Sequence, residues 1–131
     1  MASPWRRWTW AWGPAAGYMA VIFILSSFPI GVRLSLGPIT FIDKLIHAVE
    51  YGILCLLLFR GLRSGRNRRA YLWAPLAALL LSGLYGATDE WHQSFTGRDA
   101  AVADWLADTV GATAMAAALT IYAAVHKEPA S

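Results

Sequence analysis

Residues 60–69, RGLRSGRNRR, carry five arginines and separate two apolar segments, residues 45–59 and 71–86. Short loops rich in arginine and lysine stay on the cytoplasmic side of membrane proteins. We therefore expect this stretch to be a cytoplasmic loop between two membrane-spanning helices. The orientation of the whole chain follows from this loop.

Two more apolar segments, residues 14–30 and 100–125, flank this pair. The chain is 57% apolar and only 15% charged, whereas an average soluble domain has about 25% charged residues. Segments of this kind reach the roughly 20 residues needed to cross a bilayer when their polar ends are included. The sequence thus predicts an all-α membrane protein, a compact bundle of four transmembrane helices in a single domain over residues 1–131.

The remaining cationic residues complete the expected topology. Arg6 and Arg7 precede the first apolar segment among four tryptophans that suit a membrane interface. Both termini should then be cytoplasmic (N-in/C-in) in a multi-pass protein of the inner, or plasma, membrane. Because the arginines are placed as topology determinants, the net charge of +3 indicates the lipid bilayer as partner and excludes nucleic acid.

Local features refine these helices. The first apolar segment is expected to remain as a helix rather than to be a cleaved signal peptide, and Pro14 suits its first turn. Cys55 is the only cysteine and is expected to pack inside the bundle. The pairs Ala107/Gly111 and Ala114/Ala118 predict a close approach between the last helix and a neighbour.

Seven of the eight carboxylates lie at the ends of the helices opposite the arginine loop. They are Asp43, Glu50, Asp89, Glu90, Asp99, Asp104 and Asp108. Ionisable groups in membrane helices are costly and normally face the bundle interior or a wet cavity, where they serve a function. Asp99 directly precedes the last apolar segment and is expected to be an N-cap. The residues expected to face one outward-facing acidic pocket are His47, Glu50, Asp89, Glu90, Gln93, Arg98, Asp104 and Asp108.

Helical spacing supports this convergence. Asp43, His47 and Glu50 lie at i, i+4 and i+7, on one stripe that Lys44 and Tyr51 flank. Two further pairs at i and i+4 stand on the following segments: Asp89 with Gln93, beside Glu90 and His92, and Asp104 with Asp108.

The excess of negative charge must be neutralised, and three means remain open. Some carboxyl groups could be protonated, a divalent metal cation could bind oxygen and imidazole ligands, or an ordered polar network could simply hold the helices together. The candidate metal ligands are His47, Glu50, Asp89, Asp104 and Asp108.

Taken in order, these residues resemble the VanZ-like family of small bacterial membrane proteins. The shared pattern is Asp43-Lys44-x2-His47-x3-Tyr51, then Asp89-Glu90-x-His92-Gln93-x3-Gly97-Arg98-x5-Asp104-x3-Asp108-x2-Gly111, within residues 42–115. The chain departs from the family at Asp108, where Asn is more frequent, and at Ala48, where an aromatic residue is common. The resemblance implies a polytopic cell-envelope protein, and the founding relative is associated with resistance to the glycopeptide teicoplanin.

We therefore expect a pocket that binds or acts on an amphiphilic envelope molecule, such as a lipid-linked phosphate or sugar. Contacts to this ligand are assigned to Lys44, Tyr51, Gln93 and Arg98. Glu90 or His92 would be the general acid or base of a metal-assisted hydrolase or transferase. Whether the protein is an enzyme, a binding protein or a non-catalytic structural protein whose polar cluster serves helix packing stays open. Ion transport is disfavoured, because the cytoplasmic halves of the last two segments lack ionisable residues.

Overall fold

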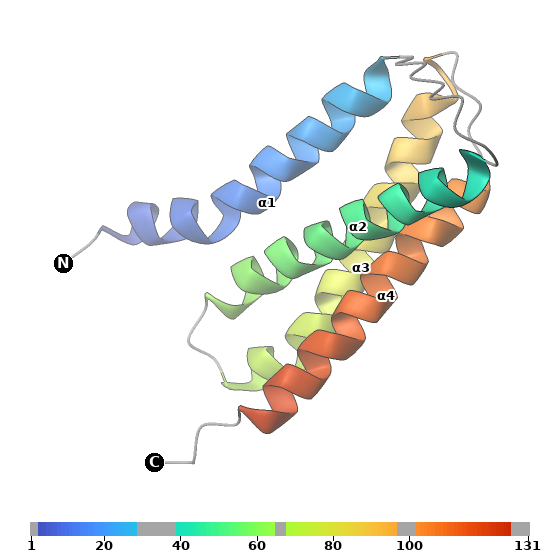
Figure 1. The fold of residues 1–131 in the computed structure, drawn as a ribbon. Helices are drawn as coiled ribbons and strands as arrows, with labels where there is room; N and C mark the ends of the chain where they lie inside the picture. The colour runs from blue at the N-terminus through green and yellow to red at the C-terminus, as the bar shows by residue number, and fades with distance from the viewer. Residues whose placement is uncertain (1–2, 29–38, 65–67, 97–101, 127–131) are drawn as a thin grey trace.

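A computed structural model describes residues 3–28, 39–64, 68–96 and 102–126 (Figure 1). The described chain is all-helical, with helices α1 (Pro4–Ser27), α2 (Ile39–Arg63), α3 (Arg68–Gln93) and α4 (Val102–Val125). The predicted all-α fold of four helices is confirmed.

Three of these four helices are long and apolar enough to cross a membrane: α1, α4 and residues Phe41–Arg63 of α2. The 24 residues of α1 or α4 extend about 36 Å, more than the roughly 30 Å of a hydrocarbon core. Large apolar side chains such as Leu84, Val110 and Ile121 are about two-thirds exposed, as lipid contact requires. The chain is therefore a membrane protein. Composition alone does not mark α3 as a span, although its 26 residues run alongside α2 and α4 (Figure 1).

Helices α2, α3 and α4 pack against one another, and α1 lies against α2 and α3 (Figure 1). Leu54 and Cys55 of α2 and Ala112 of α4 form the centre of this packing and are fully buried. The buried position of Cys55 confirms that it packs inside the bundle. Because the side chains at this centre are small or of medium size, the axes of α2 and α4 lie close together. The polar residues of α2 and α4 are therefore within reach of each other.

Successive helices run in opposite directions, so the charges separate into two ends. The basic end holds the start of α1 and the end of α2, with Arg6, Arg7, Arg60 and Arg63. The opposite, acidic end holds the start of α2, the end of α3 and the start of α4. The carboxylates gathered there are Asp43, Asp89, Glu90 and Asp104, with Asp108 one turn deeper.

Helix α1 begins earlier than the sequence suggested. We expected Pro14 in the first turn, but the helix starts at Pro4, and Pro14 lies in its interior. Ser3 caps the helix because its Oγ accepts a hydrogen bond from the Arg6 N–H at 3.5 Å, and Pro4 follows at the position that needs no N–H. The expectation for Pro14 was therefore wrong, because Ser3 and Pro4 start the helix ahead of the apolar segment.

Helix α4 approaches α2 most closely at Gly111. A Cβ atom there would overlap the carbonyl oxygen of Ala48 and stand 2.6 Å from its Cα. The predicted close approach at the Ala107/Gly111 pair is thus confirmed. The prediction for the second pair was wrong, since Ala114 and Ala118 are exposed and not packed in a close contact.

Candidate functional site

Two polar pairs join α2 to α4 at the acidic end. The Lys44 ammonium forms an ion pair with the Asp104 carboxylate and lies 3.6 Å from Asp43. One turn deeper, His47 Nδ1 and Asp108 Oδ1 are 3.0 Å apart in a hydrogen bond. The pairs stack because Lys44 and His47, like Asp104 and Asp108, occupy successive turns of one helix face.

The two pairs lead inward from the surface of the protein. The exposed fraction of the side chain falls from 50% at Asp43 and 32% at Lys44 to 15% at His47. On α4 it falls from 13% at Asp104 to 4% at Asp108. The polar groups thus form a graded series, and the outermost of them remain accessible from the end of the bundle.

Asp89 joins α3 to α1 in the same region. Its carboxylate accepts hydrogen bonds from Ser26 Oγ at 2.6 Å and from Gln93 Nε2 at 2.7 Å, and all three side chains are buried. Sequence reasoning missed Ser26. Ser26 could have been found as a hydroxyl residue near the end of the first apolar segment, at the same membrane depth as the carboxylates of the other helices.

Tyr51 contributes a buried hydroxyl group to this region. The side chain is 1% exposed, and its hydroxyl has no hydrogen-bond partner among the described residues. Its ring lies against Gly86, where a Cβ would stand 3.1 Å from the ring and 3.4 Å from Asp108 Oδ2. Asp108 and Asp89 are both near enough to interact electrostatically with the phenol. A buried donor without a partner carries a desolvation cost, so Tyr51 is suited to a bound ligand or water.

One of the two predicted acid–base residues, His92, lies against α1. The His92 ring packs on Phe23 with ring centroids 4.4 Å apart, and its Nδ1 is buried without a hydrogen-bond partner in the described chain. Glu90 and Glu50 are half-buried, and both interact with other residues. Arg98 lies outside the described residues.

The structure also groups three potential metal ligands. Ligand atoms of Asp43, His47 and Asp104 lie within 4.8 Å of one another. His47 and Asp104 belong to the set suggested by the sequence, whereas Asp89 and Asp108 are engaged in the hydrogen bonds given above. Carboxylate oxygens and an imidazole fit a divalent cation. The Lys44 ammonium, however, already contacts both carboxylates, so a metal ion would have to displace it.

Lys44→Met should convert this group into a metal-responsive site. The substitution keeps the side-chain length but removes the ammonium, which leaves Asp43 and Asp104 without their cation. We expect Mn²⁺ or Zn²⁺ to raise the Tm of the variant in detergent and to leave that of the wild type and of Lys44→Arg unchanged. An equal shift in the wild type would instead support a resident metal ion with Lys44 displaced.

The site as a whole is rich in hydrogen-bond acceptors. The described carboxylates Asp43, Asp89, Asp104 and Asp108 outnumber the cationic or imidazole partners Lys44 and His47. Ionised carboxylates only accept hydrogen bonds, so the cluster suits a ligand with hydroxyl donors. The Asp108 carboxylate also fixes the orientation of the His47 ring, as an acid–base histidine requires.

Comparison with protein families finds a match over most of the chain. The model of the VanZ/LLP1 family matches residues 6–123, which include nearly all of α1 to α4 and every described residue of the site. Neither a curated protein sequence nor a solved structure matches the chain significantly. Because this match covers most of the chain, the chain belongs to the VanZ/LLP1 family.

Proposed function

We propose that the acidic end binds the polar head of an amphiphilic cell-envelope molecule, and that this head is a lipid-linked sugar. The observation that carries the proposal is the inward series of acceptors from Asp43 to Asp108, which ends near the ring of Tyr51. The Tyr51 hydroxyl has no hydrogen-bond partner among the described residues. Sugar hydroxyls would donate to the carboxylates and accept from Tyr51. The lipid chain would lie along the exposed apolar faces of the helices.

The negative charge of the deep carboxylates favours a sugar over a phosphate as the group that binds deepest in the site. A phosphate next to Asp89 and Asp108 would meet like charge in a poorly solvated place, which is unfavourable. Among the described residues, Lys44 is the lysine or arginine side chain at the acidic end, and it would meet the linking phosphate near the surface. In this proposal Gln93 and Arg98 supply further polar contacts, and a reaction, where there is one, would use His47 with Asp108 as well as Glu90 or His92.

The binding test compares two probes that differ only in the sugar. The full chain in lipid nanodiscs is titrated with a polyprenyl-phosphate-linked monosaccharide and with the same polyprenyl phosphate lacking it. We expect the sugar to improve affinity about tenfold, on the order of 1.4 kcal/mol, and Asp104→Asn to remove most of this gain. Equal affinity for both probes would contradict the proposal and favour phosphate recognition, in which case Lys44→Met would abolish binding.

A structural role for the same residues is the alternative. It is favoured by the mutual pairing of Lys44 with Asp104 and of His47 with Asp108. Hydrogen bonds between membrane helices contribute only about 0.6 kcal/mol each, so helix packing alone gives little reason for so many buried charges. If the role were purely structural, neither probe would bind in the test above. Exchanging Lys44 and Asp104 would then leave the folding and stability of the protein unchanged.

The proposal places the acidic end outside the cell and both termini in the cytoplasm, in the inner membrane. The arginine-rich loop supports this orientation through the positive-inside rule. We expect Ser94→Cys to react with a membrane-impermeant maleimide in intact cells, and Ser64→Cys to react only after lysis. Both serines are exposed and lie at opposite ends, and Cys55→Ala provides the background without the buried thiol. Labelling of Ser64→Cys in intact cells would show that the orientation is the reverse of the one proposed.

A further inference from the structure

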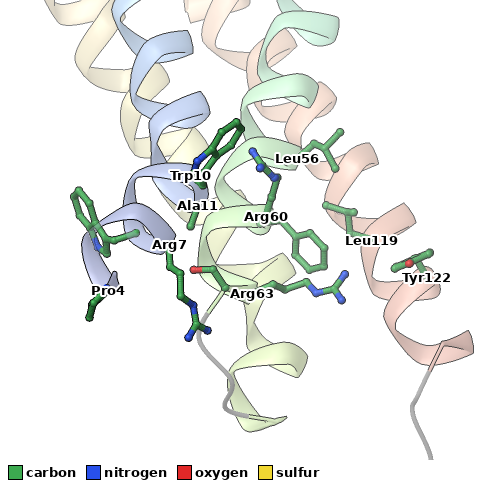
Figure 2. A pocket seen from close by; sticks show the side chains of 12 residues that line it. Pro4, Arg7, Trp10, Ala11, Leu56, Arg60, Arg63, Leu119 and Tyr122 are labelled. Carbon is green, nitrogen blue, oxygen red and sulfur yellow. The ribbon is translucent and has the colours of Figure 1, made fainter. Parts of the chain in front are cut away.

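A groove of about 1130 Å³ lies at the basic end, far from the polar cluster (Figure 2). It runs between the first turns of α1 and the last turns of α2 and α4. Its wall includes Arg7, Trp10, Leu56, Arg60, Arg63 and Leu119. The volume is slightly above the roughly 300–1,000 Å³ typical of small-molecule sites, so the groove can hold a ligand of substantial size.

The groove exists because α1 diverges from α4. Among the described residues, α1 packs on α2 and α3 but makes no contact with α4 (Figure 1). At the same end of the bundle Trp12 of α1 packs against Gly61 of α2, where a Cβ would stand 2.8 Å from the Trp12 ring. This contact holds α1 against α2, so the space toward α4 stays open to a molecule from the bilayer.

Cationic and apolar side chains line the groove together. Arg7, Arg60 and Arg63 come from two helices, and no carboxylate is among the described residues that line the groove. The Arg63 guanidinium lies 5.4 Å from the centre of the Phe59 ring, which keeps this charge at the groove wall. Leu56 precedes Arg60 by one helical turn, about 5.4 Å deeper toward the membrane interior. Cationic groups beside an apolar wall are complementary to an anionic head with an acyl chain.

We propose that this groove is a specific site for one anionic phospholipid, whose phosphodiester meets Arg7 and Arg60 and whose acyl chain lies along Leu56 and Leu119. Basic pockets between membrane helices bind such head groups. A protein or nucleic-acid partner would leave the apolar wall unexplained, because that wall belongs to membrane-spanning segments. The inference does not depend on the function proposed for the acidic end.

The test uses the full chain in detergent, titrated with phosphatidylglycerol or with phosphatidylcholine of the same acyl chains, while binding is followed by native mass spectrometry. We expect a clear preference for phosphatidylglycerol in the wild type. Arg60→Gln should weaken that binding about fivefold, and Arg7→Gln/Arg60→Gln roughly 25-fold, while Arg60→Lys retains most of it. Arg6→Gln is the matched control, because Arg6 has the same charge on the same helix end but does not line the groove.

A second variant keeps every charge and blocks the groove. Leu56→Trp should also abolish the preference, because the indole occupies the space of the acyl chain; circular dichroism and gel filtration verify the fold of each variant. Equal binding of the two lipids would overturn the proposal. An equal loss in Arg6→Gln would show general attraction by the basic end instead, and glycerol phosphate competing as well as the intact lipid would show a phosphate site without a lipid chain.

Discussion

Gly111→Ala is expected to destabilise the bundle by about 2 kcal/mol or more, and Gly111→Leu to prevent folding. The added Cβ would overlap the backbone of Ala48, which cannot rotate away as a side chain can. Alanine is about 1 kcal/mol better than glycine in a helix interior, so a loss of stability reports the contact between α4 and α2 directly. Unfolding of the full chain by SDS in mixed micelles measures it.

Gly83→Ala is the control for this substitution. Gly83 lies inside α3, and a Cβ at that position would have no heavy atom within 4 Å. It should leave stability unchanged or slightly higher. If Gly111→Ala behaved like Gly83→Ala, the close packing of α2 and α4 would be wrong, and with it the pairing of Lys44 and His47 with the residues of α4.

Asp108→Leu is expected to cost about 2–4 kcal/mol, because it leaves the His47 imidazole without its partner in the interior. Asp108→Asn should cost about 1 kcal/mol or less, since the amide oxygen can still accept from the Nδ1–H group. Asp43→Asn serves as the exposed control, with little expected effect.

A double-mutant cycle isolates the pair itself. His47→Phe and Asp108→Leu, measured separately and together in the same SDS assay, should show a coupling energy of about 1–3 kcal/mol. Additive effects would mean that the two side chains do not interact, contrary to the 3.0 Å contact.

The sequence predicts the four helices, their alternating direction and the separation of charge, because these depend on hydropathy and on arginine placement. It also predicts that Lys44, His47, Asp104 and Asp108 belong to one polar region, because each lies on a helical stripe. Family membership follows from the same residues. These signals are local, and each can be read within one segment of the chain.

The partners within the region could not be predicted, because spacing along one helix does not fix its rotation or shift relative to the next. The contact at Gly111 sets that shift, and it places Lys44 on Asp104 and His47 on Asp108. The spacing within α3 likewise could not predict that Asp89 turns toward α1 and bonds to Ser26. Ser26 carries no charge, so its role in the site became visible only in three dimensions.

The helix start at Pro4 escaped prediction because hydropathy locates the apolar part of a helix and not its interfacial turns. Ser3 and Pro4 are a capping signal in the sequence, but the tryptophans and arginines that follow obscured it. The groove at the basic end was also hidden, since it arises from the divergence of α1 and α4, two helices distant in sequence.

The central claim is that the acidic end, and not the basic groove, holds the head of a lipid-linked sugar. Photo-crosslinking tests this claim most directly. The probe is a polyprenyl-phosphate-linked monosaccharide with a diazirine on the sugar, and it is incubated with the full chain in nanodiscs. After irradiation, the labelled peptides are mapped by mass spectrometry. We predict labels on the start of α2 around Asp43–Tyr51 and on the first turns of α4, reduced in Asp104→Asn. Labels confined to the groove around Arg7 and Arg60, or spread evenly over the lipid-facing surface, would contradict the account.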